Sequence, residues 1–233
     1  LPCDDFPDGR DTSHSRDNSS YVRDGAGHKR NVGHTRDGHP RNNNSGNRDM
    51  HYQNLLCIGD SQTFGARTYG CYPLYLAQIL TEHTPYQWRT INRSVNGYTA
   101  RDLWFLLNND IEIVSDTYQA CVLIGTNDVG NETPLDLFEE YYRQIIRTLL
   151  IKKYKAIFCG EIPPIYPDGH IFFCKETAEK RNLYNAAIKK VTAENKNIVW
   201  VPINELSRNC YVDSVHFNEL GNRLVAESFT QAI

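Results

Sequence analysis

The sequence LLCIGDSQTFG at residues 55–65 decides how the rest of the chain is interpreted. Its first four residues form a short, continuous apolar run, which is typical of a strand buried inside a parallel sheet. Gly59 follows at once and lets the chain turn sharply as it leaves that strand. Ser61 is therefore expected at the carboxyl end of a strand, where open α/β sheets place their ligands. Taken alone, Gly59-Asp60-Ser61 favours an ordinary turn, since all three residues are common in turns.

Beyond this stretch, apolar runs alternate with amphipathic segments. Four further strands are predicted at residues 86–95, 118–124, 156–159 and 197–203. Helices are predicted at residues 71–82, 99–108, from 133 onward, 176–194 and 218–232. Strands that alternate with helices imply right-handed crossovers and a parallel sheet. The predicted fold class is therefore α/β, with three α/β/α layers around a five-stranded parallel sheet in a flavodoxin-like order.

The predicted helices carry apolar residues on one stripe, which should face the sheet. Thr133 is expected to cap the third of these helices, and Pro134 to occupy its first position. The apolar stripes are expected to include Leu74, Leu137, Leu183 and Leu220.

Residues 1–49 differ in composition from the rest of the chain. They are rich in Asp, Arg, Asn, Gly, Ser and His, and they contain few apolar residues. Such a segment cannot bury enough apolar surface to offset its ordering entropy, so it is not expected to fold alone. Met50, the only methionine, precedes the first predicted strand. We therefore expect residues 1–49 to be an upstream, linker or cloning-derived extension, and residues 50–233 to be the domain that carries the candidate site.

Composition argues against several classes of function. A net charge of -3 gives no attraction to nucleic acid or to an anionic membrane. No apolar run approaches the ~18 residues that a membrane span needs. The cysteines lack the Cys-x-x-Cys spacing of a metal site, and Cys57, Cys121 and Cys159 lie in apolar runs. Their odd number and placement predict a reducing compartment and a cytoplasmic location, although Cys174 and Cys210 would be able to pair in an exported protein.

Polar residues are expected to meet at the carboxyl edge of the sheet. Ser61 follows the first strand, Gly97 the second and Asn127 the third, while Asp213 and His216 precede the last helix. In a turn, an Asp three residues before a His can accept from Nδ1 and leave Nε2 free to face a serine. The N–H groups of Ser61 and Gly97 and the amide of Asn127 offer three donors to one developing oxyanion. Each residue alone has an ordinary explanation as a turn or a cap, but their joint order favours chemistry.

The same blocks resemble the SGNH (GDSL-type) hydrolase family. Residues 59–63 (GDSQT) are similar to its first block, although Gln62 stands where the family commonly has Leu or Ile. Residues 95–97 (VNG), 125–128 (GTND) and 213–218 (DSVHFN) are similar to its second, third and fifth blocks. The resemblance implies a serine esterase or lipase that acts on a small-molecule ester and needs neither a metal nor another cofactor. It assigns the catalytic triad to Ser61, His216 and Asp213, and the oxyanion hole to Ser61, Gly97 and Asn127.

The substrate is less closely defined. Tyr98, Ile165 and Phe172 come from loops that should border the site, and their apolar character suits a short acyl group. The same residues are equally able to pack over the edge of the sheet. Short-chain carboxylic esters are the expected substrates, with carbohydrate O-acetyl esters, or acyl transfer to another alcohol, as alternatives. A binding module that keeps the fold without turnover is the alternative from a different class of protein. No particular oligomeric state is predicted.

Overall fold

The structure, a computed structural model, describes residues 52–109, 117–167, 173–203 and 206–233. Five parallel strands form one sheet, in the spatial order β2-β1-β3-β4-β5. The strands are β1 (Tyr52–Gly59), β2 (Gln87–Asn92), β3 (Thr117–Leu123), β4 (Ala156–Gly160) and β5 (Ile198–Val201). This is the flavodoxin-like order, so the predicted fold class is confirmed.

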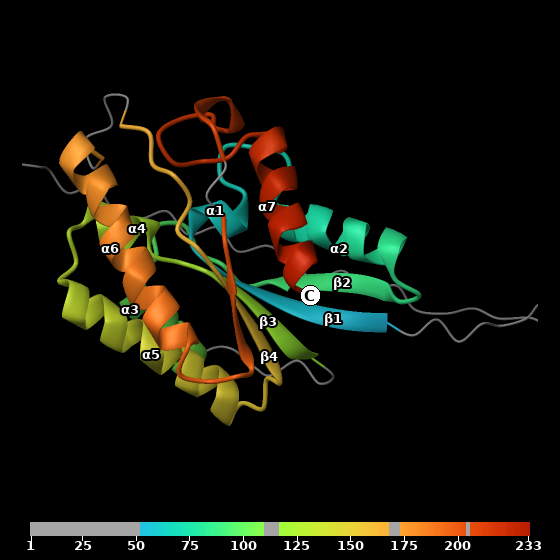
Figure 1. Ribbon diagram of the computed structural model, residues 1–233. Helices are drawn as coiled ribbons and strands as arrows, with labels where there is room; N and C mark the ends of the chain where they lie inside the picture. Colours follow the sequence, from blue (N-terminus) through green and yellow to red (C-terminus); the bar gives the residue numbers. More distant parts are fainter. Residues whose placement is uncertain (1–51, 110–116, 168–172, 204–205) are drawn as a thin grey trace, which may run out of the picture. The chain divides into compact units, whose positions relative to one another are not determined.

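Helices cover both faces of this sheet (Figure 1). On one face lie α3 (Ala100–Asn109), α5 (Leu135–Ile151) and α6 (Lys175–Thr192), and on the other lie α2 (Tyr72–His83) and α7 (Glu219–Ala232). Three short elements complete the described chain: α1 (Ser61–Phe64), α4 (Thr126–Gly130) and the 3-10 helix η1 (Arg208–Cys210). Both α1 and α4 directly follow the ends of central strands, so they begin at the carboxyl edge of the sheet.

The continuous apolar run of β1 is explained by burial on both faces. Leu56 and Ile58 pack into the cluster under α3, α5 and α6, whereas Leu55 and Cys57 pack into the cluster under α2 and α7. Successive side chains of a strand point to opposite faces, so a strand covered on both sides needs apolar residues throughout. β1 lies between β2 and β3, so its end lies inside the carboxyl edge of the sheet rather than at the margin.

Some of the predicted apolar stripes are too wide. Leu74, Leu137, Leu183 and Leu220 are 61%, 47%, 57% and 46% exposed, so the expectation that they belong to the buried faces of their helices is wrong. Each helix covers the sheet from one side only and buries a narrow stripe. Apolar residues at the margin of that stripe remain in contact with solvent, which is common on protein surfaces.

The start of α5 also differs from the prediction. The helix begins at Leu135, with Pro134 at the N-cap position, and the cap makes no side-chain hydrogen bond. Thr133 does not cap the helix: its N–H donates to the carbonyl of Asp128 at 2.9 Å, and its own carbonyl accepts from the hydroxyl of Tyr184. Thr133 therefore closes the turn that follows α4, and the helix starts one residue later than a Thr cap would place it.

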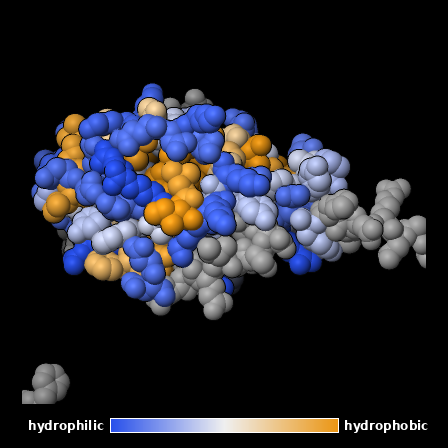
Figure 2. Space-filling model, turned by 90° about the horizontal axis from the view of Figure 1, so that it is seen from below, coloured by the Kyte–Doolittle hydropathy of each residue, from blue (hydrophilic) through white to orange (hydrophobic). Residues whose placement is uncertain are grey.

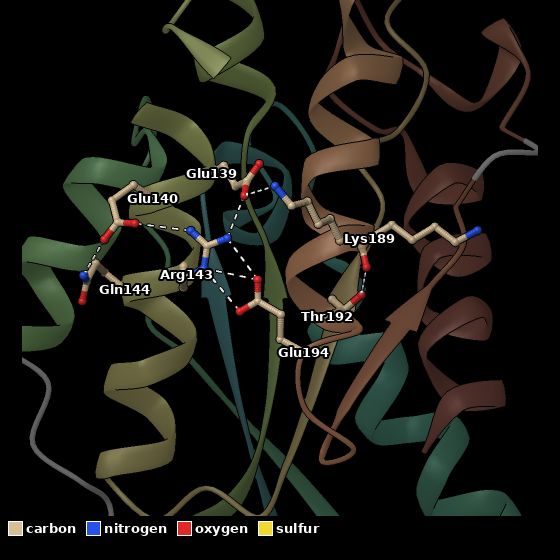
Figure 3. Close-up of polar contacts among 8 residues, drawn as sticks. Glu139, Glu140, Arg143, Gln144, Lys189, Thr192 and Glu194 are labelled. Carbon is tan, nitrogen blue, oxygen red and sulfur yellow. Dashed lines mark hydrogen bonds and ion pairs between the residues drawn. The ribbon is translucent and has the colours of Figure 1, made fainter. Parts of the chain in front are cut away.

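An ion-pair cluster joins α5 to the end of α6 (Figure 3). Arg143 contacts Glu139 one turn earlier in α5 at 2.7 Å and Glu194 beyond α6 at 3.0 Å. Lys190 of α6 reaches the same Glu139 at 2.7 Å. Exposed ion pairs contribute little individually. Together they link α5 to the end of α6, in addition to the apolar contacts beneath.

Seen from below, the described surface is mainly hydrophilic, with hydrophobic residues in a central group and several smaller ones (Figure 2). None of the helices within the described ranges is long and apolar enough to cross a membrane.

Gly59 is the glycine on which the fold depends most directly. A Cβ at this position would lie 2.1 Å from the Leu123 carbonyl oxygen and 2.4 Å from Thr63 Oγ1. Gly59→Ala should therefore destabilise the protein by about 3 kcal/mol or more in urea unfolding, because backbone must move. Gly97→Ala is the comparison: a Cβ there meets nothing within 4 Å, and only the positive φ of 81° is strained. Its expected cost is about 1–2 kcal/mol. Equal losses in the two variants would contradict this assignment.

Candidate active site

Ser61 lies in the first turn after β1, an interior strand of the sheet. Asp60 caps α1, and its Oδ1 accepts a hydrogen bond from the Gln62 N–H at 2.9 Å. Ser61 is the first residue of this short helix, and Gly65, with a φ of 86°, ends it. The turn thus holds the Ser61 side chain at the carboxyl edge of the sheet, where it is 8% exposed. This is the place at which the sequence predicts a reactive serine.

A second loop carries Asp213 and His216 to the same edge. Its two sides are joined by an antiparallel bridge between Tyr211 and Phe217. The N–H of Val212 donates to the His216 carbonyl at 2.9 Å, which closes the loop. Two N–H groups inside it, those of Val215 and His216, donate to Asp213 Oδ1 at 3.0 and 2.9 Å. The segment from Asp213 to His216 therefore folds back so that its N–H groups contact the carboxylate of Asp213.

The three side chains form one continuous chain of hydrogen bonds. His216 Nε2 lies 3.0 Å from Ser61 Oγ, and His216 Nδ1 lies 2.8 Å from Asp213 Oδ2. Ser61 and His216 are 155 residues apart in sequence. A serine, an imidazole and a carboxylate in this order, at these distances, form the geometry that activates a serine hydroxyl.

Asp213 is held in its ionised form. Burial disfavours the charge, but it is outweighed by the N–H groups of His216 and Val215 and by the His216 ring, which lower the pKa of Asp213 to about 2. Arg67 adds a salt bridge from Nη1 to Asp213 Oδ2 at 3.2 Å, although its side chain is 64% exposed and well solvated. A carboxylate that stays ionised at neutral pH can accept from Nδ1 and stabilise an imidazolium.

Gly97 and Asn127 lie beside Ser61, as the sequence predicts. The N–H of Val95 donates to the Gly59 carbonyl at 3.2 Å, which holds the loop after β2 against the end of β1. Asn127, in α4, donates from Nδ2 to the Tyr98 carbonyl at 2.9 Å. A side-chain amide has two N–H bonds. One is used to orient the group, and the other makes no hydrogen bond to the residues that the structure describes.

Two hollows meet at the Ser61–His216 pair. One, of about 250 Å³, is lined by Ser61, Gly97, Asn127, Gly130, Asn131, Phe173, Val215 and His216. The other, of about 410 Å³, shares four of these residues and adds Ala66, Arg67 and Asn96. A hollow of about 470 Å³ lies elsewhere on the described surface, between α2 and α7, and contains neither Ser61 nor His216.

Of the three predicted substrate contacts, the structure describes Tyr98 and Ile165, and neither of them lines the two hollows. Ile165 is 8% exposed and packs into the cluster under α3, α5 and α6, so it lies in the core rather than in either hollow. Tyr98 packs against the same cluster, and its carbonyl orients Asn127. Phe172 lies outside the described residues, whereas its neighbour Phe173 lines the smaller hollow. The apolar loop residues Tyr98 and Ile165 therefore pack with the core rather than line the site.

Two further residues at the site were not identified as functional from the sequence. Arg67 has no sequence signal, since its contact with Asp213 spans most of the domain. Gln62 was recognisable only as a departure from the apolar residue that commonly follows the serine. It is 2% exposed, and both ends of its amide are hydrogen bonded.

Within the part of the chain that the structure describes, no three His, Cys, Asp or Glu residues lie close enough together to hold a metal ion. The six cysteines in that part, including Cys174 and Cys210, are free thiols.

A comparison with known protein families matches the part of the chain that carries the candidate site. Residues 57–224 match the model of the GDSL-like lipase/acylhydrolase family. No curated protein sequence matches the chain significantly.

Several solved structures share the fold. The acetyl xylan esterase AlAXEase is 21% identical with a TM-score of 0.63, over 77% of this chain and 99% of that one. An acetylxylan esterase from Geobacillus stearothermophilus is 22% identical with a TM-score of 0.63, over 78% of this chain and 94% of that one. An α/β hydrolase from the metagenome of Lake Arreo, Spain, is 21% identical with a TM-score of 0.60, over 78% and 95%.

Asp60 provides a test of the local electrostatics. Burial raises the pKa of this carboxyl from 3.8 to about 7, against the opposing effect of the Gln62 N–H. The unfolded chain therefore loses this proton at lower pH than the folded protein does. Between about pH 4 and 7 the folded state binds more protons, so the free energy of unfolding falls as pH rises, on the order of 1.4 kcal/mol per pH unit for a fully shifted group.

Asp60→Asn keeps an oxygen that can accept from the Gln62 N–H but removes the titration. We expect the stability difference between this variant and the natural sequence to shift in favour of Asn as pH rises from 4 to 7, and to level off above 7. Urea unfolding at several pH values measures it. A difference that is independent of pH would show that Asp60 titrates normally.

Proposed function

Because the chain belongs to the GDSL-like lipase/acylhydrolase family, we propose that it is a serine esterase that hydrolyses short-chain carboxylic esters through an acyl-enzyme on Ser61. The family assignment makes the chain a carboxylic ester hydrolase, and the finer proposal rests on one observation. Ser61 Oγ, His216 Nε2, His216 Nδ1 and Asp213 Oδ2 form a continuous chain of short contacts at the mouth of two hollows. A silent binding module has no need of this arrangement.

The first half of the reaction acylates the serine. Ser61 Oγ attacks the ester carbonyl carbon while His216 Nε2 takes the hydroxyl proton, and Asp213 stabilises the imidazolium. The negative charge moves to the carbonyl oxygen, which faces the N–H groups of Ser61 and Gly97 and the free N–H of Asn127. When the tetrahedral intermediate collapses, the C–O bond to the alcohol breaks and His216 returns the proton to the departing oxygen.

The second half repeats these steps with water. His216 removes a proton from water, the hydroxide attacks the acyl-serine carbonyl, and the same donors hold the second oxyanion. Collapse releases the carboxylic acid and restores the Ser61 hydroxyl. An alcohol in place of water gives acyl transfer, and the open second hollow would admit one.

The size and lining of the hollows support the substrate class. The smaller hollow, about 250 Å³ and backed by Phe173, suits an acyl group of a few carbons. The second carries Arg67, Asn96 and Asn127, polar groups that suit a hydroxyl-rich alcohol. An O-acetylated carbohydrate is therefore the second candidate substrate, in keeping with the acetyl xylan esterases that share the fold.

The triad is tested by substitution and labelling. Ser61→Ala should abolish both ester hydrolysis and labelling by a serine-directed organophosphonate. His216→Ala should cost about as much, because the members of a triad act as a unit. Asp213→Ala should cost less, because it orients and stabilises without exchanging a proton. Asn127→Ala should lower kcat on the order of 10²-fold to 10³-fold with KM little changed, since its donor matches the transition state. Activity retained in Ser61→Ala would remove the serine mechanism.

The substrate class is tested with p-nitrophenyl esters of increasing acyl length, from acetate to palmitate, beside acetylated xylan. We expect acetate and butyrate to be hydrolysed fastest, because the smaller hollow has no room for a long chain. Release of acetate from xylan at a rate comparable to that from the aryl acetate would favour the carbohydrate. Faster hydrolysis of palmitate than of butyrate would contradict the short-chain assignment, and product analysis with a competing alcohol separates hydrolysis from acyl transfer.

A further inference from the structure

Gln62 is a polar side chain enclosed in the floor of the site. It is 2% exposed, and both ends of its amide are hydrogen bonded. Nε2 donates to the Val215 carbonyl at 2.8 Å, and Oε1 accepts from the Thr126 hydroxyl at 3.1 Å. The Val215 carbonyl can only accept, so it fixes which end of the amide is the nitrogen.

The two partners of Gln62 each precede a residue of the site. Val215 comes directly before His216, and Thr126 directly before Asn127. These contacts span 153 and 64 residues in sequence, so no local turn enforces them. A single amide, attached next to Ser61, thereby touches the loop of the base and the turn of the proposed oxyanion donor.

We propose that Gln62 is a positioning residue that holds the His216 loop and the Asn127 turn in register with Ser61, an inference that rests on the proposed function of these three residues. The loop that carries His216 is closed by the Tyr211–Phe217 bridge and by the bonds to Asp213. From outside it, the Tyr166 N–H donates to the Ser214 carbonyl at 2.9 Å, and the exposed Arg67 pairs with Asp213. The hydrogen bond from Gln62 links that closed loop to the turn of the nucleophile. Because catalysis depends steeply on alignment, a displacement of about 1 Å can cost on the order of 10²-fold in rate.

An apolar residue at this position would fill the space without making either bond. The alternative explanation is that Gln62 is a satisfied buried amide that contributes only to stability. The two explanations differ in what they predict for turnover well below the melting temperature, because a purely stabilising residue leaves the folded enzyme's kcat unchanged.

Gln62→Met is the most direct test, since methionine is unbranched and of similar length. The variant is assayed with p-nitrophenyl acetate about 20 degrees below its Tm, where it remains folded. Its kcat should fall roughly 10-fold, while its KM should stay within about twofold of that of the natural sequence. The rate of organophosphonate labelling at Ser61 should fall by a similar factor. Unchanged kcat and labelling, with only Tm lowered, would overturn the proposal.

Thr126→Val gives a second route that alters only one of the two bonds. It should lower kcat by roughly threefold. In the double variant the effects of Gln62→Met and Thr126→Val should be less than multiplicative, because Gln62→Met already removes the one bond that Thr126→Val removes. Thr148→Val is the matched control: Thr148 is buried in α5 and donates to the Gln144 carbonyl at 2.8 Å, away from the site. Its kcat should not change.

If Gln62→Met does not fold, Thr126→Val decides, and an unchanged kcat in that variant overturns the proposal. The outcome is separable from that of the proposed function. Loss of activity in Ser61→Ala together with full kcat in Gln62→Met would keep the serine mechanism and reject only the role of Gln62.

Discussion

The close approach of two backbones at Gly59 is the constraint on which the rest of the site depends. A Cβ at this position would stand 2.1 Å from the carbonyl oxygen of Leu123, so the end of β1 can lie this close to the end of β3 only with glycine there. The chain then enters α1 and α4 from neighbouring points on one edge. Thr63 reinforces the junction by donating to the same Leu123 carbonyl at 3.4 Å. Ser61 and Asn127 face one hollow because these two strand ends meet.

This constraint also explains which parts of the site were predictable. The carboxyl ends of parallel strands share one edge, so residues that follow successive strands, such as Ser61 and Asn127, are gathered by topology alone. The partners of Gln62 were not predictable, because a buried amide bonds to whatever backbone lies within reach. Ile165 and Leu183 show the converse problem: an apolar residue satisfies a core, a surface margin or a substrate pocket equally well. The fold and the set of polar residues at the site could thus be inferred from the sequence, whereas the residues that line the pocket could be identified only from the structure.

Two aspartates close to Ser61 have opposite properties because their surroundings differ. Asp60 is enclosed, with one oxygen accepting from the Gln62 N–H and the other without a hydrogen-bond partner among the described residues, and burial raises its pKa to about 7. Asp213 is also desolvated, but the N–H groups of Val215 and His216 and the His216 ring more than compensate and lower its pKa to about 2. Only Asp213 is a permanent carboxylate at neutral pH. The Asp-x-x-His spacing brings Asp213 to His216, and the surrounding N–H groups keep that carboxylate ionised.

Backbone carbonyls orient two of the side-chain amides at the site, those of Asn127 and Gln62. The Tyr98 carbonyl takes one N–H of Asn127, and the Val215 carbonyl takes the Gln62 amide. Both acceptors are fixed by the fold and are independent of substrate. Donors that are already oriented need no reorganisation when negative charge develops, which is the condition under which they stabilise a transition state most strongly. In the proposed mechanism, the second N–H of Asn127 is therefore oriented before any ester arrives, so its contribution is expected in kcat rather than in substrate binding.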